Sequence, residues 1–394
     1  MKRLTILIIA TLAIHGCTSR ESALREGLMK GIDAASAGML ANARLLYGTE
    51  RFPRTYENGA LVTVDKYDWT SGFFAGDLWL AYQLTGIDSL EYYARHFTGE
   101  LKEVKDFTGH HDLGFMIYCS YGKQWEIFHE QEVLQVIIDA AGSLCTRFNP
   151  GIGQIRSWDF GKWNYPVIVD NLMNLEMLFF ASKATGYDRY RDIAIAHADK
   201  TLQNHFRPDG SSYHVVSYND DGSVESKGTY QGWSDDSSWA RGQAWTLYGF
   251  TMCYRETGDE KYLDQARHIA GYIMGAVKTA DKIPYWDYND PAIPDAPRDA
   301  SAAAVTASAL LELSGYVKEK KDARAYRRYA EDILLSLSSK EYTAAPADNG
   351  NFLLKHSVSH KPLNSEVDVP LVYADYYYLE AARRWLDYDT KPAK

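Results

Sequence analysis

The chain has 394 residues, of which 46% are hydrophobic, so it is long enough to bury a large core. Its formal net charge is -10 and no run of Lys or Arg follows the first few residues, which disfavours a nucleic-acid-binding protein. The 29 Tyr and 10 Trp residues fit a large core with Tyr at partly exposed surfaces. They equally fit a site where flat aromatic rings stack on sugars.

The N-terminus has the pattern of a bacterial lipoprotein signal. A basic start precedes an apolar run over residues 4–14, which is too short to span a bilayer as a mature helix. Gly16 then stands before Cys17, as a small residue does before a cysteine that is lipidated after cleavage. We predict a signal peptide over residues 1–16, a lipidated Cys17 in a short tether over residues 17–24, and an exported protein that faces the periplasm from its membrane. Ordinary secretion with a chance cysteine is the alternative.

A repeated unit organises the rest of the chain, and consists of an apolar helix, a stop and an amphipathic helix. The stops, where glycine suits the left-handed residue beyond a helix end, are Thr85-Gly86, Tyr121-Gly122, Thr185-Gly186, Thr257-Gly258 and Ser314-Gly315. The predicted helices before the stops are apolar on nearly all sides, as buried helices are, and cover residues 72–84, 112–121, 171–184, 240–256 and 300–314, with a sixth at 369–384 that lacks the stop. The amphipathic helices cover residues 22–47, 88–106, 124–147, 188–206, 260–279 and 321–338. Six inner and six outer helices in alternation predict an all-α fold, an (α/α)6 toroid in one domain over residues 25–390.

The connections between these helices are of two kinds. Turns from inner to outer helices are short, whereas most loops from outer to inner helices are long, at residues 48–71, 148–170, 207–239, 280–299 and 339–368. In a ring of alternating helices the long loops share one face, where the inner helices begin. Long loops without regular structure in a compact domain are usually functional. We therefore expect the site at the N-terminal ends of the inner helices.

Two carboxylates stand at neighbouring inner-helix starts. Asp112 begins the second predicted inner helix, and Asp170 begins the third between apolar segments that predict a buried side chain. Each Asp on its own fits a helix cap, because its oxygen accepts from exposed backbone N–H groups. Burial favours the neutral form of a carboxyl, whereas a helix N-terminus favours the charged form. If the two carboxyls lie close together, they can divide acid and base roles.

Other polar residues at these helix starts leave alternatives open. His111 and His214 fit hydrogen-bond donors in a polar pocket better than metal ligands, since no His/Glu spacing matches a zinc site. Arg241 lies in an apolar helix and needs an anionic partner, either a carboxylate such as Asp235 or Asp236 or an anionic substrate. The scattered cysteines Cys119, Cys145 and Cys253 suggest neither a disulfide framework nor a metal site, and we predict no metal and no cofactor.

Three segments carry a resemblance to a known family: His111-Asp112-Leu113-Gly114-Phe115-Met116, Asp170-Asn171-Leu172-Met173-Asn174-Leu175 and Asp236-Ser237-Ser238-Trp239-Ala240-Arg241-Gly242-Gln243-Ala244-Trp245. With them, residues 25–385 resemble glycoside hydrolase family 88, the unsaturated glucuronyl hydrolases. The resemblance implies the (α/α)6 barrel. It also implies release of 4,5-unsaturated glucuronic acid from the non-reducing end of oligosaccharides, above all glycosaminoglycan fragments, that lyases produce. The reaction is a hydration of the C4=C5 enol ether.

The resemblance also implies roles for individual residues. Asp170 would protonate C4 and then activate water, and Asp112 would hold the ring hydroxyls and stabilise the developing positive charge. Substrate contacts would come from His111, His214, Thr229, Gln231, Arg241 and Trp245, with stacking walls from Trp69, Trp158 and Trp239. Ser359 and Lys361 fit the end of a Ser-x-x-Ser-x-Lys pattern that sulfate-recognising relatives carry, but His356 stands at its first Ser, which puts sulfate recognition in doubt.

Two other functions compete with this one. The related family 105 removes unsaturated uronate from pectin-derived rhamnogalacturonan with similar helices, although the Arg241-Gly242-Gln243-Ala244-Trp245 stretch favours family 88. A lipid-anchored glycan-binding protein without turnover is the alternative from another class. Two acidic residues at adjacent helix starts argue against it.

Overall fold

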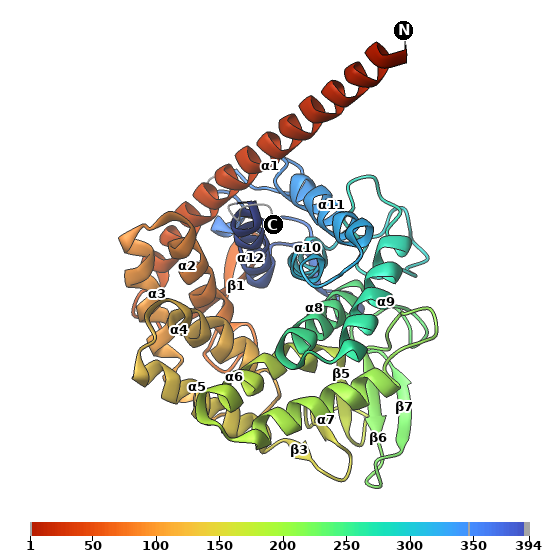
Figure 1. Ribbon diagram of the computed structural model, residues 1–394. Coiled ribbons are helices and arrows are strands. Elements are labelled where there is room, and N and C mark those ends of the chain that lie inside the picture. Colours follow the sequence, from red (N-terminus) through yellow and green to blue (C-terminus); the bar gives the residue numbers. More distant parts are fainter. Residues whose placement is uncertain (1, 346, 390–394) are drawn as a thin grey trace.

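A ring of alternating helices forms the molecule (Figure 1). The computed structural model describes the backbone of residues 2–345 and 347–389, and the side chains of residues 20–345 and 347–387. The inner helices are α2 (Ser71–Thr85), η2 (Gly114–Gly122), α6 (Leu175–Thr185), α8 (Ala240–Thr257), α10 (Ala300–Ser314) and α12 (Val372–Asp389). The outer helices are α1 (Lys2–Leu46), α3 (Asp88–Glu100), α5 (Gln131–Cys145), α7 (Asp188–Asn204), α9 (Glu260–Ala276) and α11 (Lys320–Leu337). Each inner helix contacts the next and α12 returns to α2, which confirms the predicted (α/α)6 ring.

Burial separates the two sets of helices as the apolar patterns predict. In α10, 14 of the 15 residues are buried, most of them Ala, Ser or Thr, whose small side chains allow close packing. In α11 only one stripe is buried, which includes Tyr326, Ile333 and Leu337 at helical spacing. The inner helices therefore form the core, and each outer helix covers them with one face.

The glycine stops end their helices at four places, and the stop at Gly122 is wrong. Gly86, Gly186 and Gly258 end their helices in the left-handed conformation, with φ of 70°, 71° and 69°. At Gly122 the helix does not stop, because η2 is a π-helix that runs directly into α4 (Lys123–Phe128), and the turn comes at His129. Gly315 also follows the end of its helix as predicted, but it keeps right-handed angles and its N–H donates to the carbonyl of Glu312.

Short antiparallel strands occupy four of the five long loops. From the sequence, these loops are expected to lack regular structure. Strands β1 (Phe52–Glu57) and β2 (Ala60–Val64) pair, as do β3 (Phe148–Asn149) with β4 (Gln154–Ile155) and β8 (Ser357–His360) with β9 (Ser365–Val369). A three-stranded sheet joins β5 (Pro166–Ile168), β6 (Val215–Tyr218) and β7 (Val224–Gly228). Short helices η1 (Lys102–Asp106), η3 (Val169–Asn174), η4 (Asn349–Asn351) and η5 (Lys361–Leu363) complete the connections. These strands are too short to change the helical class, but they hold the loops rigidly around the start of the inner helices.

The N-terminal prediction falls largely outside the described side chains. The backbone of α1 is helical from Lys2, whereas side chains are described only from Arg20 onward, so the predicted signal and Cys17 remain predictions. Within the described part of the chain, no helix combines the length and apolarity needed to cross a membrane. Cys119, Cys145 and Cys253 are free and buried, in line with the absence of a disulfide pattern.

Candidate active site

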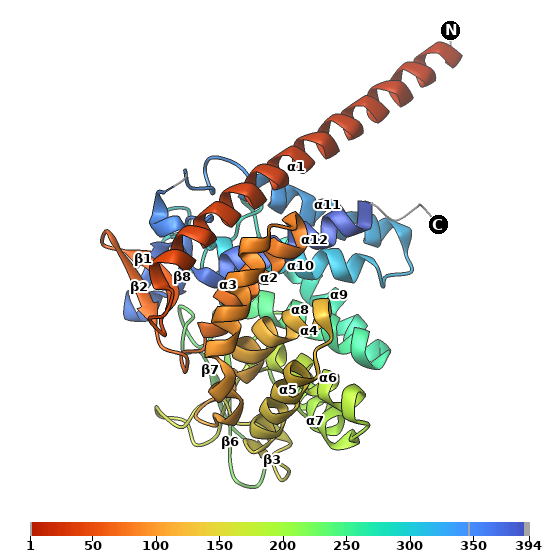
Figure 2. The same ribbon diagram turned by 90° about the vertical axis from the view of Figure 1, so that its left-hand side faces the viewer.

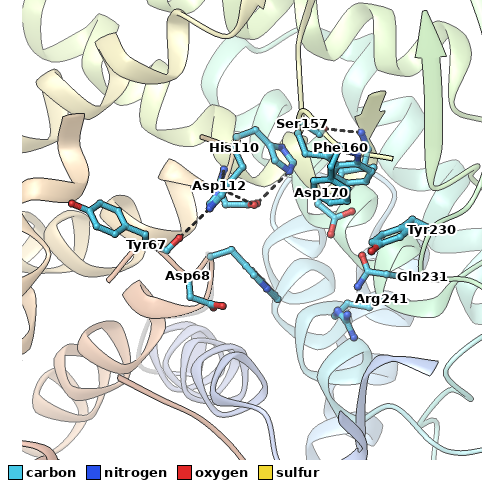
Figure 3. A pocket seen from close by; sticks show the side chains of 14 residues that line it. Tyr67, Asp68, His110, Asp112, Ser157, Phe160, Asp170, Tyr230, Gln231 and Arg241 are labelled. Atoms are coloured by element: carbon cyan, nitrogen blue, oxygen red, sulfur yellow. Dashed lines mark hydrogen bonds and ion pairs between the residues drawn. The ribbon is translucent and has the colours of Figure 1, made fainter. Parts of the chain in front are cut away.

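A pocket of about 320 Å³ opens where the inner helices begin (Figure 3). It is lined by Tyr67, Asp68, Trp69, His110, His111, Asp112, Ser157, Trp158, Phe160, Ile168, Asp170, Tyr230, Gln231 and Arg241. These residues come from the loops before α2, η2, η3 and α8, from η3 itself and from the start of α8, which is the place that the loop lengths predict.

A close approach of two helix starts places Asp112 and Asp170 in the same pocket. A Cβ atom on Gly114 would lie 2.5 Å from the Cα atom of Asn174, so only glycine lets η2 pack this tightly on η3. The Asn174 side-chain oxygen accepts from the N–H of Phe115 at 3.1 Å. The β5–β6 pairing ends at Ile168 opposite Val215, which fixes the backbone that leads into Asp170.

Asp112 lies between two histidines. Its Oδ2 atom is 3.2 Å from Nδ1 of His110, and its Oδ1 atom is 3.4 Å from Nε2 of His111. Burial by itself would raise the pKa of Asp112, but His111, His110 and a hydrogen bond from Asn174 outweigh it and hold that pKa below its ordinary value. Burial lowers the pKa of His111, against the attraction of Asp112 and Asp170. The arrangement keeps Asp112 as a carboxylate anion beside a neutral His111.

Asp170 lies beside His214, which stands behind the pocket lining. The backbone N–H groups of Tyr230 and Gln231 both donate to Nδ1 of His214 at 3.2 Å. A neutral ring that accepts at Nδ1 carries its proton on Nε2, which lies 3.4 Å from Oδ2 of Asp170. That separation is long, and Oδ2 makes no hydrogen bond of good geometry in the described structure. His214 therefore presents an N–H group to one oxygen of Asp170, a residue that is 8% exposed.

Arg241 has a different carboxylate partner from the two that the sequence suggested. Its Nη1 atom lies 3.4 Å from Oδ2 of Asp299, the N-cap residue of α10, and neither Asp235 nor Asp236 pairs with it among the described side chains. Its Nη2 atom donates to the carbonyl of Ser359 at 2.7 Å, and Nη1 donates to the carbonyl of Val358. The guanidinium thus ties β8 to the start of α8, while its Nε atom is buried without a hydrogen-bond partner and the residue still lines the pocket.

The loop over residues 156–160 forms an aromatic wall. The rings of Trp158 and Phe160 stack with centroids 5.1 Å apart, and Tyr230 lies 5.5 Å from Trp158. On the other side of the loop, Asp159 bridges two arginines, with each contact at 3.0 Å, to Arg147 and Arg156. Trp158 and Phe160 therefore line the pocket, while Asp159 between them fastens the loop to Arg147 outside it.

Seven of the predicted site residues line the pocket and six do not. Those that line it are Trp69, His111, Asp112, Trp158, Asp170, Gln231 and Arg241. His214 and Thr229 lie behind the lining, where the Thr229 hydroxyl is 3.5 Å from His214 Nδ1. The ring centroids of Trp239 and His214 lie 4.6 Å apart, and the Arg241 guanidinium lies over the face of the Trp239 ring.

The remaining three lie farther from the lining. Trp245 is fully buried between Phe115 and Tyr377 in the core. Ser359 is buried on β8, and Lys361 begins η5 beyond it. His356, at the departure from the sulfate pattern, pairs with Asp368 at 2.6 Å. Their roles in binding remain predictions.

Several lining residues did not stand out in the sequence. Tyr230, Phe160 and Ser157 belong to loops whose path depends on packing between distant segments, as in the hydrogen bond from His111 N–H to the carbonyl of Ser157. Asp299 carried a weak signal, because it is an Asp directly before the fifth inner helix. No three His, Cys, Asp or Glu side chains converge as metal ligands in the part of the chain that the structure describes.

The polar groups of the site are arranged to receive a polar ligand. Buried atoms without a hydrogen-bond partner include His111 Nδ1, Trp158 Nε1, Asp170 Oδ2 and Arg241 Nε. Leaving a buried polar group unpaired costs about 1–3 kcal/mol, so such a concentration at one pocket indicates a binding site. A carboxylate anion, a second carboxyl with an adjacent N–H donor, and an arginine together suit acid–base chemistry on an anionic sugar.

Comparisons with known proteins agree with this site. The Glycosyl Hydrolase Family 88 profile matches residues 48–393. An unsaturated glucuronyl hydrolase of Formosa agariphila is 45% identical over 344 residues, covering 86% of this chain and 85% of that protein. An unsaturated chondroitin disaccharide hydrolase of Streptococcus pneumoniae is 33% identical, covering 84% and 85%. A crystal structure of an unsaturated glucuronyl hydrolase specific for heparin superimposes with a TM-score of 0.89 at 47% identity, covering 93% of this chain and 98% of that one. The chain belongs to glycoside hydrolase family 88 and is a glycosidase.

Proposed function

We propose that this enzyme releases 4,5-unsaturated glucuronic acid from the non-reducing end of glycosaminoglycan fragments, with Asp170 as acid and base. The observation that carries the assignment is the position of Asp170. Its carboxyl is nearly buried, points into the pocket that also holds Asp112 (Figure 3), and has one oxygen next to the N–H of His214.

The proposed reaction begins with proton transfer from the Asp170 carboxyl to C4 of the enol ether, which leaves positive charge shared by C5 and the ring oxygen. The resulting Asp170 carboxylate takes a proton from water as the water oxygen bonds to C5. The product is a hemiketal. It opens by breaking the bond between C5 and the ring oxygen, and the hemiacetal left at C1 then releases the neighbouring sugar.

Two neighbours support these steps. Asp112, held as an anion by the histidines beside it, offers negative charge and hydrogen-bond acceptors near the positively charged intermediate. The Nε2 atom of His214 lies 3.4 Å from Oδ2 of Asp170, so a small approach would let its N–H donate there and leave the other oxygen to carry the transferred proton. The rule that links carboxyl separation to inversion or retention does not apply, because neither carboxyl attacks the anomeric carbon.

For the glycan, we favour heparin-type fragments. The heparin-specific relative is 47% identical, whereas the chondroitin disaccharide hydrolase from Streptococcus pneumoniae is 33% identical.

An ultraviolet assay tests the proposal, because hydration destroys the chromophore of the unsaturated uronate. We expect loss of absorbance with unsaturated heparin disaccharides, slower loss with unsaturated chondroitin disaccharides, and retention of absorbance in Asp170→Asn. Full activity in that variant would refute the mechanism. Turnover of unsaturated galacturonyl-rhamnose alone would refute the substrate class and leave the role of Asp170 intact.

We also propose that the enzyme is exported and anchored through Cys17 on the periplasmic side of a membrane. The support is the basic start, the short apolar run and the Gly16-Cys17 junction. Fractionation of cells should find the wild-type protein with membranes and Cys17→Ser in the soluble fraction. Mass spectrometry should find acyl groups on an N-terminal peptide that begins at Cys17. A soluble wild-type protein with an unmodified cysteine would contradict the anchor.

A further inference from the structure

The outer surface of the ring is unevenly charged. Helix α11 has five basic residues against three acidic ones, and α1 has four against three from Cys17 onward. The outer helices α3, α5, α7 and α9 have at least as many acidic residues as basic ones. Because α1 and α11 contact each other, the excess positive charge of the outer helices gathers on one side of a chain whose net charge is -10.

The basic residues of α11 form a stripe that consists of Lys320, Lys321, Arg324 and Arg328. Lys321, Arg324 and Arg328 follow one another at spacings of three and four residues along one side of the helix, Lys320 stands next to Lys321, and all four are exposed. Lys320, Lys321 and Arg324 pair with no carboxylate among the described side chains, and Arg328 lies 3.7 Å from Asp332. A hollow of about 290 Å³ between α1 and α11 is lined by Arg324, Arg328 and Arg20, among others. The stripe therefore presents free positive charge to whatever approaches this side.

The stripe lies toward the end of the ring opposite the catalytic pocket. Outer helices run opposite to inner ones, so the starts of α1 and α11 lie where the inner helices end. Figure 2 shows this arrangement, with the N-terminus projecting on the right and the strands β1, β2 and β8 on the left. Cys17 stands three residues before Arg20, whose guanidinium pairs with Asp332 of α11. A lipid on Cys17 would hold the stripe close to the membrane.

We propose that the basic stripe of α11 binds an anionic phospholipid surface, and that it adds a second attachment to the lipid at Cys17. The inference rests on the proposed anchor for its choice of partner. Basic residues close to an acidic bilayer each strengthen attachment about fivefold, and a lipid chain combined with a basic patch holds better than either one. Attachment at this end directs the catalytic pocket away from the bilayer, toward dissolved oligosaccharides.

Vesicle sedimentation tests the stripe without the lipid. The protein would be the mature chain from residue 17 with Cys17→Ser, mixed with vesicles of phosphatidylglycerol and phosphatidylcholine or of phosphatidylcholine alone. We expect binding to the acidic vesicles only, and weaker binding as salt is raised. Lys321→Gln with Arg324→Gln should weaken binding at least about 10-fold. The matched control is Arg189→Gln with Arg191→Gln, two exposed arginines on α7, which should bind like the parent.

Three outcomes would overturn the proposal: equal binding to both kinds of vesicle, an equal loss in the control pair, or no loss in the α11 pair. A sulfated heparin fragment is the competing ligand. Suppose that the parent protein binds that fragment and not the vesicles, and that the variant Lys321→Gln with Arg324→Gln no longer binds the fragment. In that case the stripe is a glycan-binding surface and the proposal is wrong. Acylation of Cys17 does not enter this measurement, so a failed anchor and a failed stripe give different results. Hydrolysis of the unsaturated disaccharide should be unchanged in both pairs.

Discussion

The two ends of the ring both bury charged groups, but they treat them in opposite ways. At the end away from the pocket lies a cluster that consists of Lys123, Glu176, Arg255, Glu312, Glu380 and Arg384. Glu312 accepts from Arg255 at 2.9 Å and pairs with Arg384 at 2.8 Å, and Arg255 also pairs with Glu176. Glu380 accepts from Ser308 at 2.6 Å and lies 3.9 Å from Lys123. At the pocket end, buried atoms of Asp170, His111 and Arg241 have no hydrogen-bond partner.

The cluster and the pocket differ in the cost in stability that their buried polar groups carry. In the cluster, burial by itself would raise the pKa of Glu312, but Arg384 and Arg255 outweigh it and hold that pKa below its ordinary value. Each charge of the cluster has its partner inside the protein. The pocket leaves polar atoms unpaired, and a bound sugar can satisfy them. Stability should therefore depend on the cluster and catalysis on the pocket, and the predictions below test that separation.

The largest expected effects come from one substitution at each end. Asp170→Asn should lower kcat about 10²–10⁴-fold, because it removes the proton donor, with little change in the free energy of unfolding. Glu312→Gln should lower the free energy of unfolding by about 3–5 kcal/mol, because Arg255 and Arg384 each lose one of their buried counter-charges. Its kcat should remain close to that of the wild type. Denaturant titration measures the free energy of unfolding of both variants, and the ultraviolet assay measures their kcat. A large loss of kcat in fully folded Glu312→Gln would show that the cluster also serves catalysis.

A smaller effect is expected at His214, which acts on Asp170 rather than on the sugar. His214→Ala should lower kcat about 10²-fold with a small change in KM, since misplacement of a catalytic group by about 1 Å has an effect of that size. His214→Gln should recover part of the rate, because an amide N–H can replace the donor at Nε2. The kcat and KM of both variants, measured with the unsaturated disaccharide, test whether His214 acts through Asp170. A rise in KM alone, equal in both variants, would instead make His214 a substrate contact.

The aromatic wall should respond weakly to the loss of its fastening. Asp159→Asn removes the charge that bridges Arg147 and Arg156 at 3.0 Å. Exposed ion pairs contribute about 0–1 kcal/mol each, so KM should rise a few-fold while kcat stays constant. Disaccharide kinetics measure this effect, and Asp221→Asn in the distant β6–β7 turn is the control. A fall in kcat without a change in KM would show that the loop serves the chemistry rather than binding.

The smallest effect concerns a buried carboxyl that is already neutral. Burial and the neighbouring Asp375 raise the pKa of Asp77 well above its ordinary value, so Asp77→Asn should change the free energy of unfolding at pH 7 by less than about 1 kcal/mol. Burial also raises the pKa of Asp375 to about 7. Between about pH 4, where the unfolded chain loses this proton, and pH 7, the native state binds more protons than the unfolded state. Stability from Asp375 therefore falls as pH rises through that window.

Unfolding at several pH values checks the sign. Asp375→Asn should flatten the slope between about pH 4 and 7. A steeper slope in that variant would contradict the assignment. A loss above about 3 kcal/mol in Asp77→Asn would show that its carboxyl is ionised and paired, like the carboxylates of the cluster.

The ring, its twelve principal helices and the end at which the pocket lies could be predicted from the amino-acid sequence. Helical periodicity and loop length are local properties, and each can be read from a short stretch of chain. The family motifs then marked Asp112 and Asp170, which periodicity alone could not distinguish from helix caps. Even the wrong stop at Gly122 was a local error, because a π-helix differs from an α-helix by one residue in its hydrogen bonding.

Only the tertiary structure decided which side chains meet. Arg241 pairs with Asp299 and with carbonyls of β8, although Asp235 and Asp236 are nearer in the sequence. The backbone N–H groups that fix the ring of His214 come from residues 230 and 231, which a strand and a turn bring back to it. Trp245 faces the core rather than the pocket lining. Such contacts depend on how each helix is rotated about its own axis and on the path of long loops, which are set by packing between segments distant in the chain.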